Sequence, residues 1–154
     1  MSLENHQDSS NRYLIFRING TLYGSQLLDV REVVQYNEPK VIPNTRKHFS
    51  GVINLRGAIV GVIDMRAKCG FSSQDDLKKA VFLVCETESG FLAAHVDAIE
   101  SVVTIEDTLV EKNPPIQVSI EQRYMMGVAK VEDKLITLIN LKNFLSEDKV
   151  TLDA

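Results

Sequence analysis

Two oppositely charged residues, Glu32 and Arg56, are the strongest candidates for chemistry in this sequence of 154 residues. A carboxylate held against a guanidinium forms charge-assisted hydrogen bonds that fix the geometry of a turn and present charge for recognition. We expect both residues at or near the surface, on adjacent strands. The other interpretation, to which spacing alone gives even weight, is that both are solvated surface charges.

Residues for catalysis or metal binding do not occur together. The sequence has no G-x-S-x-G nucleophile motif, no glycine-rich phosphate loop and no H-E-x-x-H pair. The histidines His6, His48 and His95 are scattered among unlike segments, and a structural role is favoured for His95. Cys69 and Cys85 have neither metal-site nor redox spacing. We therefore expect no enzyme activity, no metal and no cofactor.

The elements that must position Glu32 and Arg56 are mainly strands. Short runs of β-branched and aliphatic residues alternate with Gly, Asn, Asp and Pro, a pattern typical of β-proteins. Strands are predicted over 13–19, 21–25, 29–35, 52–55, 58–63, 81–86, 91–95, 99–105, 128–131 and 135–139. Short helical turns, two of them with Asp64 and Asn140 as N-caps, are predicted over 44–49, 65–69, 119–126 and 141–145.

The pattern of strands and turns occurs twice, on either side of the polar segment 72–79. Gly51-Val52 matches Gly127-Val128, and the capped turn that begins at Asp64 matches the one at Asn140, both at an offset of 76. Each half has about 70 residues, a size at which an isolated core is marginal. We predict a tandem duplication whose halves, about 13–70 and 80–140, form two small β-barrels packed around a shared core.

The repeat is broken at the charged residues. Arg56-Gly57 at the first hairpin tip corresponds to Glu132-Asp133 in the second half, and Glu32 corresponds to Ser101. Scaffold positions should accept similar residues in both halves, whereas a binding site need exist only once. The difference therefore favours a site on the first half.

Composition excludes several classes of protein. Apolar residues make up 44% and charged residues 25%, as in ordinary globular proteins. The net charge of −4 argues against generic nucleic-acid binding. Residues 1–12 are polar and predict a disordered tail rather than a signal peptide, and the longest apolar runs are too short to span a bilayer. We expect a stand-alone cytoplasmic protein without membrane insertion, monomeric in isolation, with a second tail over 147–154.

The segment Gly51–Arg66, which reads GVINLRGAIVGVIDMR, closely resembles the signature of the CheW family, the coupling proteins of bacterial chemotaxis. The resemblance covers about 12–146 and includes YLIF at 13–16, VREVV at 30–34 and VIPN at 41–44. It implies a mainly β, CheW-like fold. In that fold two pseudo-symmetric five-stranded SH3-like barrels, with short helical turns and a short C-terminal helix, form a single domain over 13–146 with a shared hydrophobic core.

The resemblance also implies a non-enzymatic adaptor. Such an adaptor joins the cytoplasmic tips of methyl-accepting chemoreceptors to the histidine kinase CheA through that kinase's CheW-like regulatory domain. Glu32 and Arg56 match the charged pair on which this coupling depends in the family, and neighbouring positions of the site are Val30, Val33, Gly51 and Gly57. A further contact with the kinase is expected on apolar edge surface of the first barrel near Tyr36, Val41, Ile42 and Pro43.

Two other functions remain open from the sequence. An adaptor of the same fold could serve another chemosensory pathway, such as pilus-based motility, and the sequence does not separate the two. A small-molecule-binding double β-barrel or a hydrolase, from a different class, would need convergent polar groups facing an apolar pocket. The sequence does not reveal such a group.

Overall fold

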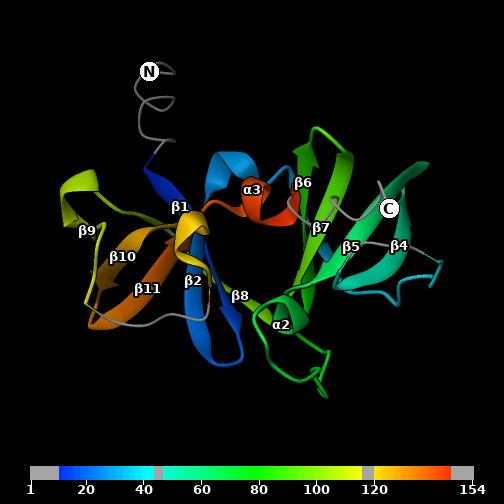
Figure 1. The fold of residues 1–154 in the computed structure, drawn as a ribbon, viewed down its shortest axis with the longest axis horizontal. Coiled ribbons are helices and arrows are strands. Elements are labelled where there is room, and N and C mark those ends of the chain that lie inside the picture. Colours follow the sequence, from blue (N-terminus) through cyan, green and yellow to red (C-terminus); the bar gives the residue numbers. More distant parts are fainter. Residues whose placement is uncertain (1–10, 44–46, 116–119, 147–154) are drawn as a thin grey trace.

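The computed structural model describes residues 11–43, 47–115 and 120–146, whose strands form two sheets placed side by side (Figure 1). Sheet A has the order β8-β1-β2-β11-β10-β9. Its strands are β1 (Arg12–Ile18), β2 (Thr21–Gln26), β8 (Ala98–Thr104), β9 (Val110–Glu111), β10 (Met125–Val131) and β11 (Lys134–Ile139). Sheet B has the order β3-β6-β7-β5-β4. Its strands are β3 (Glu32–Gln35), β4 (Phe49–Leu55), β5 (Ala58–Asp64), β6 (Val81–Thr87) and β7 (Gly90–Val96). The fold is mainly β, as predicted.

Each sheet takes strands from both halves of the sequence. The β1–β2 hairpin of the first half pairs with β8 and β11 of the second half. The β6–β7 hairpin of the second half pairs with β3 and β5 of the first half. The predicted division, with 13–70 in one barrel and 80–140 in the other, differs from this topology because the halves exchange their first hairpins.

Neither sheet closes into a barrel. The end strands of each sheet are not neighbours in its hydrogen-bonded order, so the expected pair of five-stranded SH3-like barrels is replaced by open sheets of six and five strands. Short strands limit the ladders, since β3 has four residues and β9 has two. In sheet B, the gap between the end strands β3 and β4, which no backbone ladder closes, is called the seam.

The predicted duplication is visible in the backbone. The β4–β5 and β10–β11 hairpins have the same register shift, just before Gly51 and Gly127. These glycines have φ angles of 141° and 151°, a conformation that other residues rarely adopt. A side chain at either position would also meet the backbone carbonyl of Lys40 or Glu111 on the adjacent segment.

A central apolar cluster joins the two sheets. It contains side chains from both sheets and both helices, among them Phe16, Ile63, Leu83, Ile139 and Phe144. Smaller clusters lie within sheet A and within sheet B. Burying one such side chain contributes about 1.5–3 kcal/mol. Separating the sheets would expose the central cluster, so the two sheets share a hydrophobic core as predicted.

The two α-helices of the described residues begin at the predicted N-caps. The Asp64 carboxylate accepts hydrogen bonds from the backbone of Arg66 (3.0 Å) and Ala67 (3.3 Å) at the start of α2 (Met65–Lys68). The Asn140 side chain accepts one from the backbone of Asn143 (3.2 Å) in α3 (Leu141–Ser146). Helix α3 follows β11 of sheet A but packs on β6 and β7 of sheet B, at the junction of the sheets (Figure 1).

The other two predicted helical turns differ from the structure. Within 44–49, residues 44–46 lie outside the described residues, and Phe49 begins β4 instead of ending a helix. Within 119–126, Ser119 also lies outside them, a short 3-10 turn η3 covers Gln122–Tyr124, and β10 then begins. Two further 3-10 turns were not predicted from the sequence. They are η1 (Leu27–Asp29), between β2 and β3, and η2 (Asp107–Leu109), between β8 and β9. The predicted tails lie almost wholly outside the described residues.

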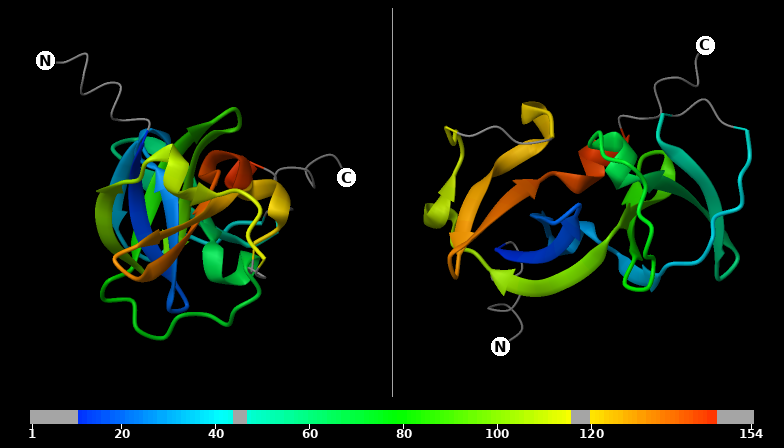
Figure 2. Two further views of the ribbon diagram at one scale, coloured as in Figure 1. Left: turned by 90° about the vertical axis from the view of Figure 1, so that its left-hand side faces the viewer. Right: turned by 90° about the horizontal axis from the view of Figure 1, so that it is seen from below.

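Asp97 fastens three segments at the crossing between the sheets. It is the only residue between β7 of sheet B and β8, which leads into sheet A (Figure 2). Its carboxylate accepts hydrogen bonds from Arg66 Nη2 (2.7 Å) and Nε (2.9 Å) in α2, and from the backbone N–H of Asn19 (2.8 Å) in the β1–β2 turn. Because the side chains of Arg66 and Asp97 are only 18% and 13% exposed, this ion pair is shielded from solvent.

The hairpin exchange predicts that the first half cannot fold alone. A fragment of residues 1–70 lacks β8, β11, β6 and β7, the partners of β1, β2, β3 and β5. We expect it to aggregate or to show no cooperative thermal transition by circular dichroism. As the control, fragments 1–78 and 79–154 produced together should assemble and melt cooperatively. A cooperative, monomeric transition of 1–70 alone would contradict the shared core.

The Arg66–Asp97 pair predicts a large effect on stability. Arg66→Ala leaves the Asp97 carboxylate shielded without its main partner, which should lower the free energy of unfolding by about 2–4 kcal/mol. The matched control is Arg31→Ala, since Arg31 pairs with Glu86 at 3.0 Å but is 60% exposed. That change should cost less than about 1 kcal/mol. Equal losses in chemical denaturation would refute the structural role of the shielded pair.

Candidate functional site

Glu32 and Arg56 form a bidentate ion pair. Arg56 Nη1 donates to Glu32 Oε2 at 3.0 Å, and Nη2 donates to Oε1. Glu32 begins β3 and Arg56 follows the end of β4, and these are the two end strands of sheet B. The sequence predicted that the two residues lie on adjacent strands. They lie instead on the two end strands of sheet B and pair across the seam. The sheet curls far enough for its ends to meet through side chains.

The hairpin turn holds Arg56 at its tip. Arg56 and Gly57 have φ angles of 51° and 88°, the left-handed conformation that a two-residue hairpin turn of this type requires. The Asn54 side chain accepts a hydrogen bond from the backbone of Gly57 at 2.9 Å and closes the turn. Turn and ion pair together define the position of a guanidinium whose side chain is still 69% exposed.

Both partners of this pair are charged at neutral pH. The hydrogen bond from Arg56 lowers the pKa of the Glu32 carboxyl, the charges of Arg56 and Arg31 act in the same direction, and desolvation opposes them. Glu32 in turn raises the pKa of Arg56. Because exposed ion pairs add little to stability, the pair is better suited to recognition than to holding the fold.

The second half has no equivalent of this pair among the described residues. Glu132 has the same φ of 51° as Arg56, so the turn is the same while the charge is reversed. Strand pairing confirms that Ser101 occupies the position of Glu32, because Ser101 is opposite Ile15 as Glu32 is opposite Val84. The turn is thus part of the scaffold, and the pair is particular to the first half.

A neighbouring ion pair, in contrast, has an equivalent in both halves. Arg31 pairs with Glu86 at 3.0 Å, and the corresponding positions of sheet A hold Glu100 and Arg17, paired at 2.8 Å with the signs exchanged. This pair recurs in both halves and belongs to the scaffold. Arg31 nevertheless precedes Glu32 in the chain, and its guanidinium lies 5.5 Å from the centre of the Phe91 ring. It therefore widens the charged surface around the Glu32–Arg56 pair. Arg31 is not among the predicted site residues, although it belongs to the segment VREVV.

The other predicted site residues divide into two groups. Val33 is 45% exposed on β3, Val30 is half-buried against the central cluster, and Gly57 follows Arg56 directly. These lie around the ion pair. Gly51, at the start of β4, is roughly 16 Å along the strand from Arg56. Its backbone conformation recurs at Gly127, so the fold alone explains this glycine.

The predicted kinase-contact residues also separate. Val41 is 81% exposed and Ile42 is 38% exposed, and Pro43 is exposed beside them. Tyr36 instead is half-buried, with its ring centre 5.3 Å from that of Phe82 and 5.0 Å from that of His95. Only 41–43 therefore form an outward apolar surface.

Neither a metal-binding cluster nor an accessible thiol is found among the described residues. No three His, Cys, Asp or Glu side chains of this part of the chain are placed to hold a metal ion. Both cysteines are buried, and burial raises the pKa of the Cys69 thiol to about 11 and that of the Cys85 thiol to about 12. These thiols stay protonated at neutral pH, consistent with a role in packing. No helix in the described ranges is long and apolar enough to cross a membrane.

Comparison with known proteins identifies the family. Residues 12–149 match the model of the CheW-like domain. The chain is 28% identical to the probable chemotaxis protein CheW of Rhizobium etli over 91% of each chain, and 28% identical to the chemotaxis protein CheW of Rhizobium meliloti over 94% of each. Its fold is similar to that of the scaffolding protein TtCheW of Thermoanaerobacter tengcongensis, with a TM-score of 0.78 and 31% identity over 88% of this chain and 87% of that one. The chain therefore belongs to the CheW family, the scaffold proteins of chemotaxis.

Proposed function

We propose that the protein couples methyl-accepting chemoreceptors to the histidine kinase CheA by binding the cytoplasmic receptor tips and the CheW-like regulatory domain of the kinase. The observation that carries this proposal is the exposed Glu32–Arg56 pair, which is present in only one of two otherwise similar hairpins. An exposed charged pair that the scaffold does not require is expected where a partner must be recognised. In this role the protein acts in the cytoplasm and carries out no reaction.

The pair is suited to binding a partner without rearrangement. Glu32 takes one N–H from each terminal nitrogen of Arg56, which leaves the remaining N–H groups of the guanidinium available to a partner. Because the hairpin tip is already fixed, little conformational entropy is lost when a partner docks. Val33, the neighbour of Glu32 on β3, adds exposed apolar surface near the charged anchor, whereas Val30 packs against the central cluster.

A second contact, with the kinase, is proposed on the segment 41–43. Val41 and Ile42 present apolar surface next to the outer edge of β4, where Lys40 pairs with Val52. This surface is small, and small interfaces bind weakly on their own. Many such contacts in an array would act together through avidity, so modest affinity between isolated domains is expected.

The test of the charged pair is Arg56→Ala. Truncating a charge that becomes desolvated at an interface leaves partner groups unpaired, so binding of the receptor tip and of CheA in a pull-down or titration calorimetry should weaken by about tenfold or more. The melting temperature should remain close to that of the unchanged protein, because the pair is exposed. Glu32→Lys should act in the same way by repelling Arg56.

The control is the corresponding hairpin of the second half. Glu132→Arg places an arginine in the same turn without a carboxylate at the position of Ser101. It should bind both partners almost normally. Equal impairment by Glu132→Arg, or a large drop in melting temperature for Arg56→Ala, would contradict the assignment of this hairpin to coupling.

The kinase surface is tested separately with Val41→Asp. A carboxylate at this exposed position costs little in the free protein but is poorly tolerated in an apolar interface. Binding of the CheA regulatory domain should weaken, whereas binding of an isolated receptor tip should not change. The result that would exclude this surface is an unchanged affinity for the kinase domain, or an equal loss of both partners.

A further inference from the structure

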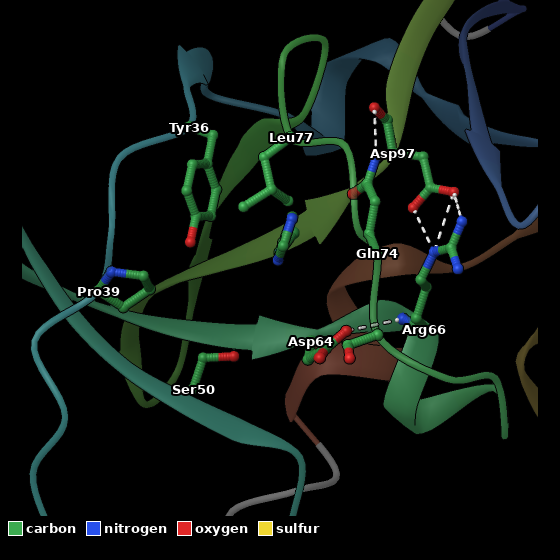
Figure 3. A pocket seen from close by; sticks show the side chains of 10 residues that line it. Tyr36, Pro39, Ser50, Asp64, Arg66, Gln74, Leu77 and Asp97 are labelled. Carbon is green, nitrogen blue, oxygen red and sulfur yellow. Dashed lines mark hydrogen bonds and ion pairs between the residues drawn. The ribbon is translucent and has the colours of Figure 1, made fainter.

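A cavity of about 200 Å³ lies at the end of the seam opposite Glu32 and Arg56. Glu32 begins β3 and Arg56 follows β4, whereas Tyr36 follows the end of β3 and Ser50 is near the start of β4. The cavity lies between these last two residues and is also lined by His95 on β7 and by Asp64 at the end of β5. The segment 72–79 passes over it, with Gln74 and Leu77 beside the opening (Figure 3).

The duplication shows that the fold does not require this cavity. Hydrogen bonding and strand register relate Tyr36 to Ile105, because their backbone N–H groups bond to the corresponding carbonyls of Ala80 and Asn11. The register shifts likewise relate Ser50 to Met126. In sheet A, Ile105 and Met126 pack in an apolar cluster. The scaffold can therefore be filled at this place, and the side chains of the first half leave it open.

Two buried polar atoms face this region without a partner. Neither His95 Nε2 nor Gln74 Oε1 has a hydrogen-bond partner among the described residues. The Gln74 amide nitrogen donates to the carbonyl of Asp97 at 3.4 Å. A carbonyl can only accept, so the other amide atom of Gln74 is its oxygen, an acceptor. Leaving such a group buried and unpaired is unfavourable, so a ligand that bonds to it is favoured.

The His95 imidazole provides a second acceptor. Desolvation lowers its pKa, although the charges of Asp64 and Asp97 oppose the effect. The ring is therefore neutral at pH 7, and one nitrogen of a neutral imidazole accepts a hydrogen bond. With the proton of the neutral ring on Nδ1, Nε2 is the acceptor, and a ligand that satisfies both His95 Nε2 and Gln74 Oε1 carries N–H or O–H donors.

The charges around the cavity favour a cation. Two carboxylates line it against one guanidinium, and Arg66 is already paired with Asp97 through two nitrogens. The Asp64 carboxylate accepts hydrogen bonds from the backbone N–H groups of α2, and its charge also acts on Arg66 and His95. The ring of Tyr36 adds an aromatic surface at the mouth, which also attracts cations.

We propose that this cavity binds a small cation with N–H donors, of the guanidinium or ammonium class, between His95, Gln74 and Asp64. Its volume is below the roughly 300–1,000 Å³ of pockets for drug-sized ligands, so the bound group has few atoms. The group can come from a free small molecule or from an arginine or lysine side chain of a partner. The inference does not depend on the coupling function proposed above.

The test is a titration of the isotope-labelled full chain with methylguanidinium and methylammonium, followed by NMR. Saturable shifts are expected for the His95 imidazole and for the amides of Gln74 and Asp64. Methylurea, a neutral analogue of methylguanidinium with similar N–H groups, should bind about tenfold more weakly. The absence of saturable shifts with either cation, or equal binding of methylurea, would overturn the proposal.

Two variants locate the response. Ser50→Met introduces the residue found at the equivalent position of sheet A and should abolish the shifts by filling the cavity. His95→Gln copies Gln26 of sheet A, which pairs with Tyr13 as His95 pairs with Phe82. This variant should weaken the shifts even if Ser50→Met perturbs the fold. Glu132→Arg, on the distant hairpin, should bind like the unchanged protein. Shifts that persist in both cavity variants would place the cation elsewhere and refute the site.

A last arm separates the two sources of the cation. N-acetylarginine amide carries the guanidinium on a peptide-like backbone. Tighter binding than methylguanidinium would support a partner's arginine side chain as the occupant. Binding of methylguanidinium with exclusion of N-acetylarginine amide would support a free small cation in the same cavity.

Discussion

The exchange of hairpins between the two halves is the constraint on which the rest of the structure depends. Once β1–β2 pairs with β8 and β11, and β6–β7 pairs with β3 and β5, neither sheet is complete without both halves. The central cluster, to which helix α3 contributes side chains, then fills the junction between the sheets. The shielded Arg66–Asp97 pair and its link to Asn19 lie where the chain crosses between the sheets, so electrostatics and packing stabilise one junction.

This interdependence frees the seam of sheet B from a structural role. The ends of sheet B are joined by side chains instead of a continuous ladder, with Glu32 and Arg56 at one end of the seam and the cavity beside Tyr36 and Ser50 at the other. Both features lack an equivalent among the described residues of sheet A. A duplicated scaffold can vary such positions in one copy while the other copy retains the residues that packing prefers.

The local features could be predicted from the sequence because they depend on neighbouring residues. The N-caps Asp64 and Asn140 begin helices as predicted, and the predicted match of Gly51 with Gly127 is seen in their similar backbone conformation. The exchange of hairpins could not be predicted, because the continuous apolar run YLIF in β1 is equally compatible with pairing to β3 or to β8. The same ambiguity placed Glu32 and Arg56 on adjacent strands when they meet across the seam.

The cavity becomes apparent when the two halves are compared, whereas local sequence patterns give no sign of it. Ser50 stands where sheet A has Met126, and Tyr36 stands where sheet A has Ile105. These differences become meaningful only when the register identifies the positions as equivalent and as facing an interior. Read as single residues, Ser50 and Gln74 are ordinary polar side chains near loops, and His95 is a half-buried histidine at a strand end. Burial leaves two of these side chains, Gln74 and His95, each with an unpaired polar atom. The comparison of halves that identified Arg56 also identifies the cavity. In a duplicated fold, the positions that differ between copies while the backbone stays the same are where specific function is to be sought.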